Sequence, residues 1–487
     1  MHGCISKWLV GGLALAVVCG GPAIGRGQQP LYQADQNYSL VAETPQTVAD
    51  GQLVSGYTAT DDVTARLEKV EAALKKIDDK AKEDKKKAAG KPSIAIGGRL
   101  VIDAALFDQS SLNKSTYGNM VNGAGFRSVR LHAEGKAFEI VNYKTEFDFV
   151  GGVYDINGQT LLGNGVQFKD NYIGVSDLPY VGNIRVGHFR EPFSLEELTS
   201  ARYLTFMERS MLNQLMVPSR NMGVMCYDYW EEPSIAWQVG TFLNSVPDTL
   251  PRVDNDKLIP TADIRVVWQP WYDEATEAGV LHLGAAYSYR PGRSTAGVGD
   301  NIFRARPNTV FGGSAAYIIQ AGRPDLVDWQ LAGLEFAYMY GPFSFQSEAM
   351  AAMLNPQNGD PEATLRGAYF MVSYFLTGEH RGYHRKEGKF DRVKVNENFF
   401  RVRAEDHCVY TGKGAWELAY RYDYVDASEA YWASARQDLA YTHTCGVNWY
   451  LNSYTRCMFD WVHLDSSRGN TSGGSADIAM MRVQVDF

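Results

Sequence analysis

The sequence predicts an all-β fold, a transmembrane antiparallel β-barrel of about sixteen strands preceded by a short periplasmic coiled-coil helix. Three observations support this fold class. From Ser93 onward, apolar and polar residues alternate with the period of a β-strand. The apolar faces of these segments are rich in aromatic residues, and the connections alternate between short and long. Short turns at one end and long loops at the other are typical of membrane-spanning barrels.

The N-terminus of the 487-residue chain predicts export. Lys7 precedes the apolar run 9–18, which is too short to span a bilayer and fits the core of a signal peptide. We expect residues 1–25 to be cleaved, rather than lipidated at Cys19, because the branched Val18 precedes that cysteine where lipoprotein signals prefer a small residue. The exported chain would then begin with a flexible linker.

Residues 26–60, rich in Gln, Ala, Thr and Gly, are that linker, and residues 61–90 are predicted to form a periplasmic coiled coil. Apolar residues there step by four and three, as in a heptad seam: Val63, Leu67, Val70, Leu74, Ile77 and Ala81. Leu at one core position with β-branched residues at the other favours three or four parallel helices. A lone solvated helix is the alternative, because the seam is short. Residues 91–487 form the barrel.

Composition and motifs exclude other classes of protein. The net charge of −9 argues against a nucleic-acid binder. Nucleophile-elbow, zinc-protease and P-loop patterns are absent, so we expect neither an enzyme nor a cofactor or metal. The cysteines that remain after cleavage are interpreted as isolated small apolar residues, without a disulfide framework: Cys226, Cys408, Cys445 and Cys457.

The alternation is clearest in the stretch "GAWELAYRYDYVD". Trp416, Leu418 and Tyr420 share one face of this predicted strand, whereas Glu417 and Arg421 share the other. The stretches "RSVRLHAEGK" and "NYKTEFDFV" alternate in the same way. A half-buried sheet of a soluble protein also alternates, but the number of such strands and their aromatic load favour a barrel with its apolar face in lipid and its polar face on water. Closing the sheet into a barrel gives every strand a hydrogen-bonded neighbour on both sides. This is required in lipid, where no water is present to bind unpaired backbone groups.

Three connections are unusually long: residues 191–220 and 291–325 on the long-loop side and residues 377–413 on the short-turn side. A barrel of this size encloses an aqueous channel that must be narrowed if it is to discriminate solutes. A loop that lies inside needs apolar residues to pack on the wall and charged residues to face water. The first stretch has suitable apolar residues: Phe193, Leu195, Leu198, Leu204, Phe206 and Met207.

Two arginines of this region are expected to pin the loop rather than to bind a solute. Arg190 has Glu191 as its neighbour, and Arg209 has Glu208. The chain ends with "MMRVQVDF", in which Phe487 closes an alternating strand. A terminal Phe in this context resembles the signal by which the barrel assembly machinery recognises its substrates.

Four motifs in order resemble the phosphate-selective porin O and P family: "GHFREPFSLEELTSARYLTFMERS", "YFLTGEHRGYHRKEGKF", "GAWELAYRYDYVD" and "HTCGVNWYLN". The resemblance covers roughly residues 94–487. It implies an outer-membrane porin of a Gram-negative-type envelope, usually a homotrimer, embedded in outer-membrane lipid. It further implies a passive water-filled channel for small anions such as phosphate or polyphosphate, narrowed by the three long connections.

The resemblance also implies roles for individual residues. Arg202 lies where the family has its central cation, in the third external loop. An arginine there can bind an oxyanion through two parallel hydrogen bonds. The other positions that match basic or acidic residues of the family's constriction are Arg127, Arg304, Arg306, Lys389 and Asp148.

Two alternatives remain open from the sequence. The barrel could be a general porin or a porin for other solutes, because a fold does not determine a permeant solute. It could also be an anchor that links the outer membrane to the periplasm through the coil at residues 61–90.

Overall fold

The computed structural model describes the barrel region almost completely. The described residues are 91–150, 166–243, 260–292, 303–322, 326–357, 359, 361–403, 409–430 and 438–487. The predicted signal peptide at 1–25 and linker at 26–60 lie outside them. Of the predicted coiled coil at 61–90, only Ala72, Lys75, Lys76 and Lys80 are described, and these four are helical.

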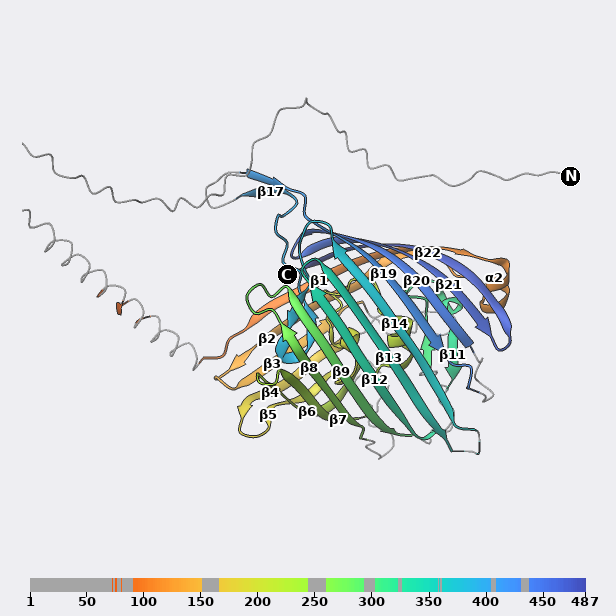
Figure 1. The fold of residues 1–487 in the computed structure, drawn as a ribbon, viewed down its shortest axis with the longest axis horizontal. Coiled ribbons are helices and arrows are strands. Elements are labelled where there is room, and N and C mark those ends of the chain that lie inside the picture. The colour runs from red at the N-terminus through yellow and green to blue at the C-terminus, as the bar shows by residue number, and fades with distance from the viewer. Residues whose placement is uncertain are drawn as a thin grey trace, which may run out of the picture. The chain divides into compact units, whose positions relative to one another are not determined.

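Sixteen antiparallel strands form a closed barrel, as the sequence predicts (Figure 1). In order around the barrel they are β1 (Ala95–Gln109), β2 (Gly123–Ala137), β3 (Val141–Asp148), β4 (Gln167–Leu178), β5 (Gly182–Arg190), β6 (Arg220–Trp230), β7 (Ile235–Phe242), β8 (Ala262–Tyr272), β9 (Gly279–Pro291), β12 (Leu326–Tyr340), β13 (Phe343–Pro356), β14 (Ala363–Phe375), β19 (Ala415–Asp426), β20 (Asp438–Asn452), β21 (Thr455–Arg468) and β22 (Thr471–Asp486).

The remaining elements belong to the connections. The short helices are α2 (Ser111–Tyr117), α3 (Leu195–Leu198), α4 (Met211–Met216), η1 (Gly313–Ala316) and η2 (Arg385–Glu387). Three small hairpins are β10 (Phe303–Ala305) with β11 (Ile319–Gly322), β15 (Gly382–His384) with β16 (Lys389–Asp391), and β17 (Phe400–Arg403) with β18 (Val409–Gly412). Among the residues that the structure describes, none of these helices has the length and apolar content of a transmembrane helix.

The two faces of the wall have opposite chemistry. In β8, Ile264 and Trp268 are exposed on the outer face, whereas Arg265 between them is almost completely buried inside. In β19, Leu418 is 44% exposed and Glu417 is fully buried. This pattern confirms the predicted faces, because an apolar outer surface suits lipid and a polar inner surface suits a lumen.

The first and last strands close the barrel through an antiparallel ladder between β1 and β22. At the end of this ladder, the amide N–H of Phe487 donates to the Gly98 carbonyl at 3.0 Å, and the Gly98 N–H donates to the Phe487 carbonyl at 2.8 Å. A Cβ at Gly98 would lie 2.6 Å from the Arg130 carbonyl, so the close approach requires glycine. Recognition of Phe487 by the assembly machinery stays a prediction.

Two of the long connections fold into the barrel, as predicted. We call residues 191–219 loop 3 and the described residues 303–322 loop 5. Loop 3 contributes Met211 and Leu212, and loop 5 contributes Ile318, to an apolar cluster that also contains the inner-wall residues Leu331 and Leu365. All five side chains are completely buried. The lumen is therefore filled on the side of β12–β14, β19 and β20.

The third long connection, residues 376–414, is only partly inside, which corrects the prediction for 377–413. We call it the long turn. Its first half reaches the lumen, where Phe390 packs against Leu195 of loop 3. Further along, the ring of Phe399 lies 4.6 Å from that of Trp449, a residue on the outer face of β20. The hairpin β17–β18 follows Phe399 and lies outside the barrel (Figure 1).

The described cysteines are free, as predicted. Cys445 lies opposite Trp461 and Cys457 lies opposite Trp449 in the ladder of β20 and β21, so neighbouring strands do not bring the two thiols together. Cys408 lies outside the described residues.

Leu334, near the middle of β12, is 64% exposed on the outer face. We expect Leu334→Arg to destabilise the barrel in lipid by about 2–4 kcal/mol, because the charge would lie near the centre of the hydrocarbon layer. Urea unfolding in phospholipid vesicles measures the change, with Leu334→Phe as the control. Equal unfolding free energies for the two variants would contradict the assignment of this face to lipid.

Candidate functional site

Loop 3 and the long turn enclose a cavity of about 320 Å³ against the wall β1–β7. Its charged lining is unbalanced: among the described residues that line it, eight are Lys or Arg and five are Asp or Glu. The cations are Arg99, Arg130, Lys144, Arg185, Arg190, Arg202, Arg220 and Lys389. Such a lining favours negatively charged solutes.

Loop 3 is positioned first by its helix α3. The carboxylate of Glu348 on β13 accepts hydrogen bonds from the amide N–H groups of Leu195 at 3.1 Å and Glu196 at 2.8 Å. The hydroxyl of Ser194 accepts the N–H of Glu197 at 3.1 Å. These groups satisfy donors that a helix N-terminus leaves free, so α3 is fixed to the wall.

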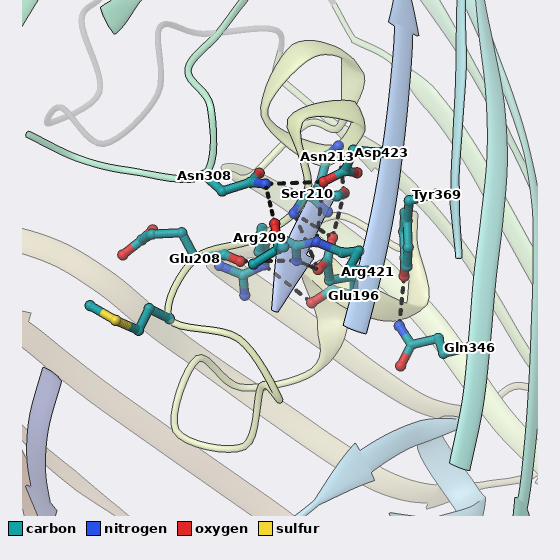
Figure 2. A network of polar contacts seen from close by, with 12 residues as sticks. Glu196, Glu208, Arg209, Ser210, Asn213, Asn308, Gln346, Tyr369, Arg421 and Asp423 are labelled. Carbon is teal, nitrogen blue, oxygen red and sulfur yellow. Dashed lines mark hydrogen bonds and ion pairs between the residues drawn. The ribbon is translucent and has the colours of Figure 1, made fainter. Parts of the chain in front are cut away.

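A buried polar network ties loop 3 to loop 5 and to β19 (Figure 2). Glu196 accepts from the Ser210 hydroxyl at 2.6 Å and from Arg421 of β19 at 3.2 Å. Arg421 also pairs with Asp423 at 3.1 Å, and the side-chain amide of Asn308 in loop 5 donates to Asp423 at 3.2 Å. Arg421 therefore holds both loops against one strand.

The backbone of residues 202–207 is held by side chains of β20–β22. Backbone groups that are buried away from water need hydrogen-bond partners, and here the inner wall supplies them. Asn448 donates to the Thr205 carbonyl at 2.7 Å, Arg456 to Leu204 at 2.7 Å and Gln484 to Arg202 at 3.2 Å, while Asp460 accepts the Met207 N–H at 2.8 Å. The side chain of Arg202 is thereby directed to the cavity.

Glu208 forms the next anchor of loop 3. Its carboxylate lies 2.7 Å from Arg127 and 2.7 Å from Arg482, and Arg482 also binds Asp103 at 2.7 Å. Burial alone would raise the pKa of Glu208, but the two guanidinium groups lower the pKa to about 2. Glu208 is therefore ionised at neutral pH, and Arg127 is occupied by it.

The long turn is positioned by Arg265 of β8. Arg265 pairs with Glu335 at 2.7 Å and donates to the Gly388 carbonyl at 2.8 Å and to the Glu387 carbonyl at 3.2 Å. Gly388 has a φ of 57°, which favours glycine. Burial opposes ionisation of Glu387, but the adjacent Lys389 lowers its pKa to about 2. Both side chains consequently enter the cavity as a charged pair.

Most cations of the cavity have carboxylate partners. Such pairs fix the positions of the side chains and leave little net charge at each of them. The pairs are Arg130 with Asp148 at 2.6 Å and Glu146 at 2.9 Å, Arg220 with Asp170 at 2.8 Å, Lys144 with Glu134 at 2.9 Å, Arg190 with Glu197 at 3.2 Å, and Lys389 with Glu387.

Three arginines differ from this pattern. Arg202 has its nearest carboxylate, Asp486, at 3.9 Å. For Arg99 and Arg185, no carboxylate of the described residues forms an ion pair. The Nε of Arg99 donates to the Ser128 hydroxyl at 3.2 Å. Among the described residues, these three arginines are therefore the lining cations whose charge is least balanced by a close carboxylate.

The predicted constriction residues are distributed over several places. Arg202 and Lys389 line the cavity. Arg127 is bound to Glu208, and Asp148 lies behind the lining residue Arg130. In loop 5, the guanidinium groups of Arg304 and Arg306 lie over the ring of Tyr317, at 4.5 and 4.0 Å, and neither lines the cavity.

The arginines expected to pin loop 3 do not pair with their neighbours in sequence. Arg190 and Arg209 both bind Glu197, at 3.2 and 3.0 Å. Glu191 instead binds Arg290 of β9 at 2.5 Å, and Glu208 binds Arg127 and Arg482. Both arginines thus hold loop 3 through Glu197 rather than through the glutamate next to each of them in sequence.

Five lining cations were not predicted as site residues from the sequence: Arg99, Arg130, Lys144, Arg185 and Arg220. Alternation does place Arg130 and Lys144 on polar faces. Arg185 lies between Ile184 and Val186, so it faces inward by the same rule. The alternation in the sequence therefore placed these side chains on the inner face, but it did not show which part of the wall the loops leave uncovered.

A closed barrel with an apolar outer face and a charged lumen narrowed by inward loops defines an outer-membrane channel. The model of the phosphate-selective porin O and P family matches residues 94–487. The chain belongs to this family of outer-membrane porins. Family and fold indicate a channel rather than an enzyme, and the described ranges contain no cluster of His, Cys, Asp and Glu arranged to hold a metal ion.

Individual relatives agree with the family. Porin O of Pseudomonas aeruginosa is 28% identical over 434 residues, which cover 81% of this chain and 88% of that protein. An uncharacterized protein of Caulobacter vibrioides is 26% identical over 377 residues, covering 75% and 68%. Among solved structures, the anion-selective porin from Comamonas acidovorans aligns with a TM-score of 0.48 at 13% identity, covering 82% of this chain and 100% of that one.

The lowered pKa of Glu208 predicts a pH dependence. A carboxylate with a folded-state pKa of about 2, below its ordinary 4.5, contributes stability that is present above pH 4.5 and is lost as the pH falls towards 2. We expect Glu208→Gln to lower the free energy of unfolding at neutral pH by roughly 2 kcal/mol, with the difference from the wild type vanishing near pH 2. Chemical unfolding in detergent across this range measures it, and Glu231→Gln in an exposed turn is the control. A constant difference at every pH would contradict the assignment.

Proposed function

We propose that the cavity is the selectivity constriction of a passive channel for small anions, with phosphate or polyphosphate as the permeant class. One observation carries the proposal: eight cations face five carboxylates there, and within the described residues Arg99, Arg185 and Arg202 have no carboxylate closer than 3.9 Å. Guanidinium groups donate planar pairs of hydrogen bonds to oxyanions. They can replace part of the hydration shell that an anion loses on entry.

The paired cations around these three arginines explain how a bound anion is released. An anion that leaves Arg202 meets Lys389, whose charge is balanced by Glu387. Neighbouring sites of moderate strength let an ion move on, whereas one deep site would trap it. The net charge of −9 for the whole chain does not oppose this mechanism, because local charge at the constriction governs the permeant ion.

The proposed partners follow from the surface of the barrel and from the family. The exposed apolar outer wall supports embedding in outer-membrane lipid, and the last strand, ending at Phe487, supports recognition by the barrel assembly machinery. We propose a homotrimer, in keeping with the heptad seam in residues 61–90, whose core residues favour three or four helices.

A role as a periplasmic anchor is a second candidate function, favoured by the same heptad seam. Deletion of residues 61–90 separates the two functions. We expect the deleted protein to keep its single-channel conductance and selectivity, because the cavity is built from residues 98–391, and to lose any tether to periplasmic components. Planar-bilayer recording and co-sedimentation with cell-wall material measure these outcomes. Loss of conductance in a folded barrel would contradict the separation.

Charge removal at the constriction tests the channel itself. We expect Arg202→Ala to lower the permeability ratio of chloride to potassium several-fold, because it removes a cation without a close partner, and Arg202→Lys to restore part of it. Reversal potentials in a salt gradient measure the ratio. Arg366→Ala is the matched control, since that side chain is 57% exposed and outside the cavity. Unchanged ratios in folded Arg202→Ala would reject the constriction.

A further inference from the structure

Part of the cavity lining is apolar and would not take part in binding phosphate. An apolar cluster, which we call the aromatic wall, lies on the inner face of β4–β7; its members are Tyr172, Phe189, Met225, Tyr227 and Phe242. Three of them, Tyr172, Phe189 and Met225, line the same cavity as the arginines. The cavity therefore combines cationic and apolar surfaces.

The aromatic wall differs from the other apolar clusters of the lumen in having no loop on it. Each of the other clusters includes a residue of an inward connection: Met211 of loop 3, Met207 of loop 3, Phe390 of the long turn or Val393 of the long turn. Among the described residues, the aromatic wall consists of strand residues alone. Phe189, Met225 and Phe242 are themselves buried, so the half-buried ring of Tyr172 is the part of the aromatic wall that a solute in the cavity can contact.

Arg185 joins the two surfaces. Its guanidinium lies 4.3 Å from the ring centroid of Tyr172 and 4.9 Å from that of Tyr227, and it donates to the Tyr227 hydroxyl at 3.4 Å. Its Nε is buried and has no hydrogen-bond partner among the described residues. A guanidinium stacked on rings keeps its edge N–H groups available for an anion. The anionic group of a solute could thus bind Arg185 while its apolar part contacts the ring of Tyr172.

We propose that this constriction preferentially takes small organic anions that carry a flat apolar group, such as aryl phosphonates, over inorganic anions of the same charge. The inference rests on the proposed function, an anion channel, and extends its ligand class from phosphate to organic anions. The size of the cavity agrees with it, because about 320 Å³ corresponds to roughly ten water molecules at about 30 Å³ each. That space accommodates a phenyl ring together with its anionic group.

The test compares phenylphosphonate with methylphosphonate as blockers of the chloride current in planar bilayers, at an alkaline pH at which both are dianions with the same head group. We expect the concentration that halves the current to be about tenfold lower for phenylphosphonate, from apolar area removed from water. Tyr172→Ala, and Arg185→Lys, which keeps the charge and loses the planar fork, should bring the two blockers within about twofold of one another.

Tyr420→Ala, on the outer face of β19, is the matched control and should keep the tenfold preference. Equal block by the two phosphonates in the wild-type channel would overturn the inference and leave the anion channel standing. Reversal potentials recorded on the same membranes separate the two hypotheses, because a cation-selective channel would overturn the proposed function itself. A preference that persists in both folded variants would also overturn the role of the aromatic wall.

Discussion

The architecture of the lumen depends on one requirement, that buried backbone groups of the inward loops find hydrogen-bond partners. The inner wall supplies these partners. Asn448 and Arg456 donate to carbonyls of loop 3, and Glu348 and Asp460 accept its N–H groups. Strands β13 and β20–β22 therefore hold the backbone of loop 3, whereas β1–β7 form the wall of the cavity. The polar face of a barrel strand thus either holds a loop or lines the cavity, depending on whether a loop covers it.

The electrostatics of the cavity follow from this division. Arg421, which anchors loop 3, is buried and is bound to the carboxylates of Glu196 and Asp423 and to the Glu208 carbonyl. Arg421 therefore fixes the position of the loop and adds little positive potential to the cavity, since a buried ion pair mainly fixes geometry. In β1, Arg99 donates to the neutral hydroxyl of Ser128 and forms no ion pair with a carboxylate of the described residues. Two arginines of the same barrel thus differ in function because of their partners.

Local periodicity explains how much could be predicted from the sequence. Alternation identified the strands, the lipid-facing side of residues such as Leu418 and the two loops that enter the lumen, because each of these depends on a short stretch of chain. The partner of Arg190 and the exposure of Arg185 to the cavity could not be predicted, because both depend on which strands the loops cover. The prediction that the long turn folds inward was correct only for its first half, for the same reason. The turn leaves the lumen near Phe399, and this depends on the contact of Phe399 with Trp449.

The surroundings of Arg202 show how strong binding of an anion is avoided. Arg392 of the long turn binds Asp486 closely and donates to the Tyr203 hydroxyl at 3.2 Å, which joins the turn to loop 3 and to the last strand. The same Asp486 lies 3.9 Å from Arg202. A carboxylate at this distance balances part of the charge of Arg202 without occupying its hydrogen-bond donors. An incoming anion can therefore bind these donors, yet it experiences a weakened attraction, and this combination permits both entry and release.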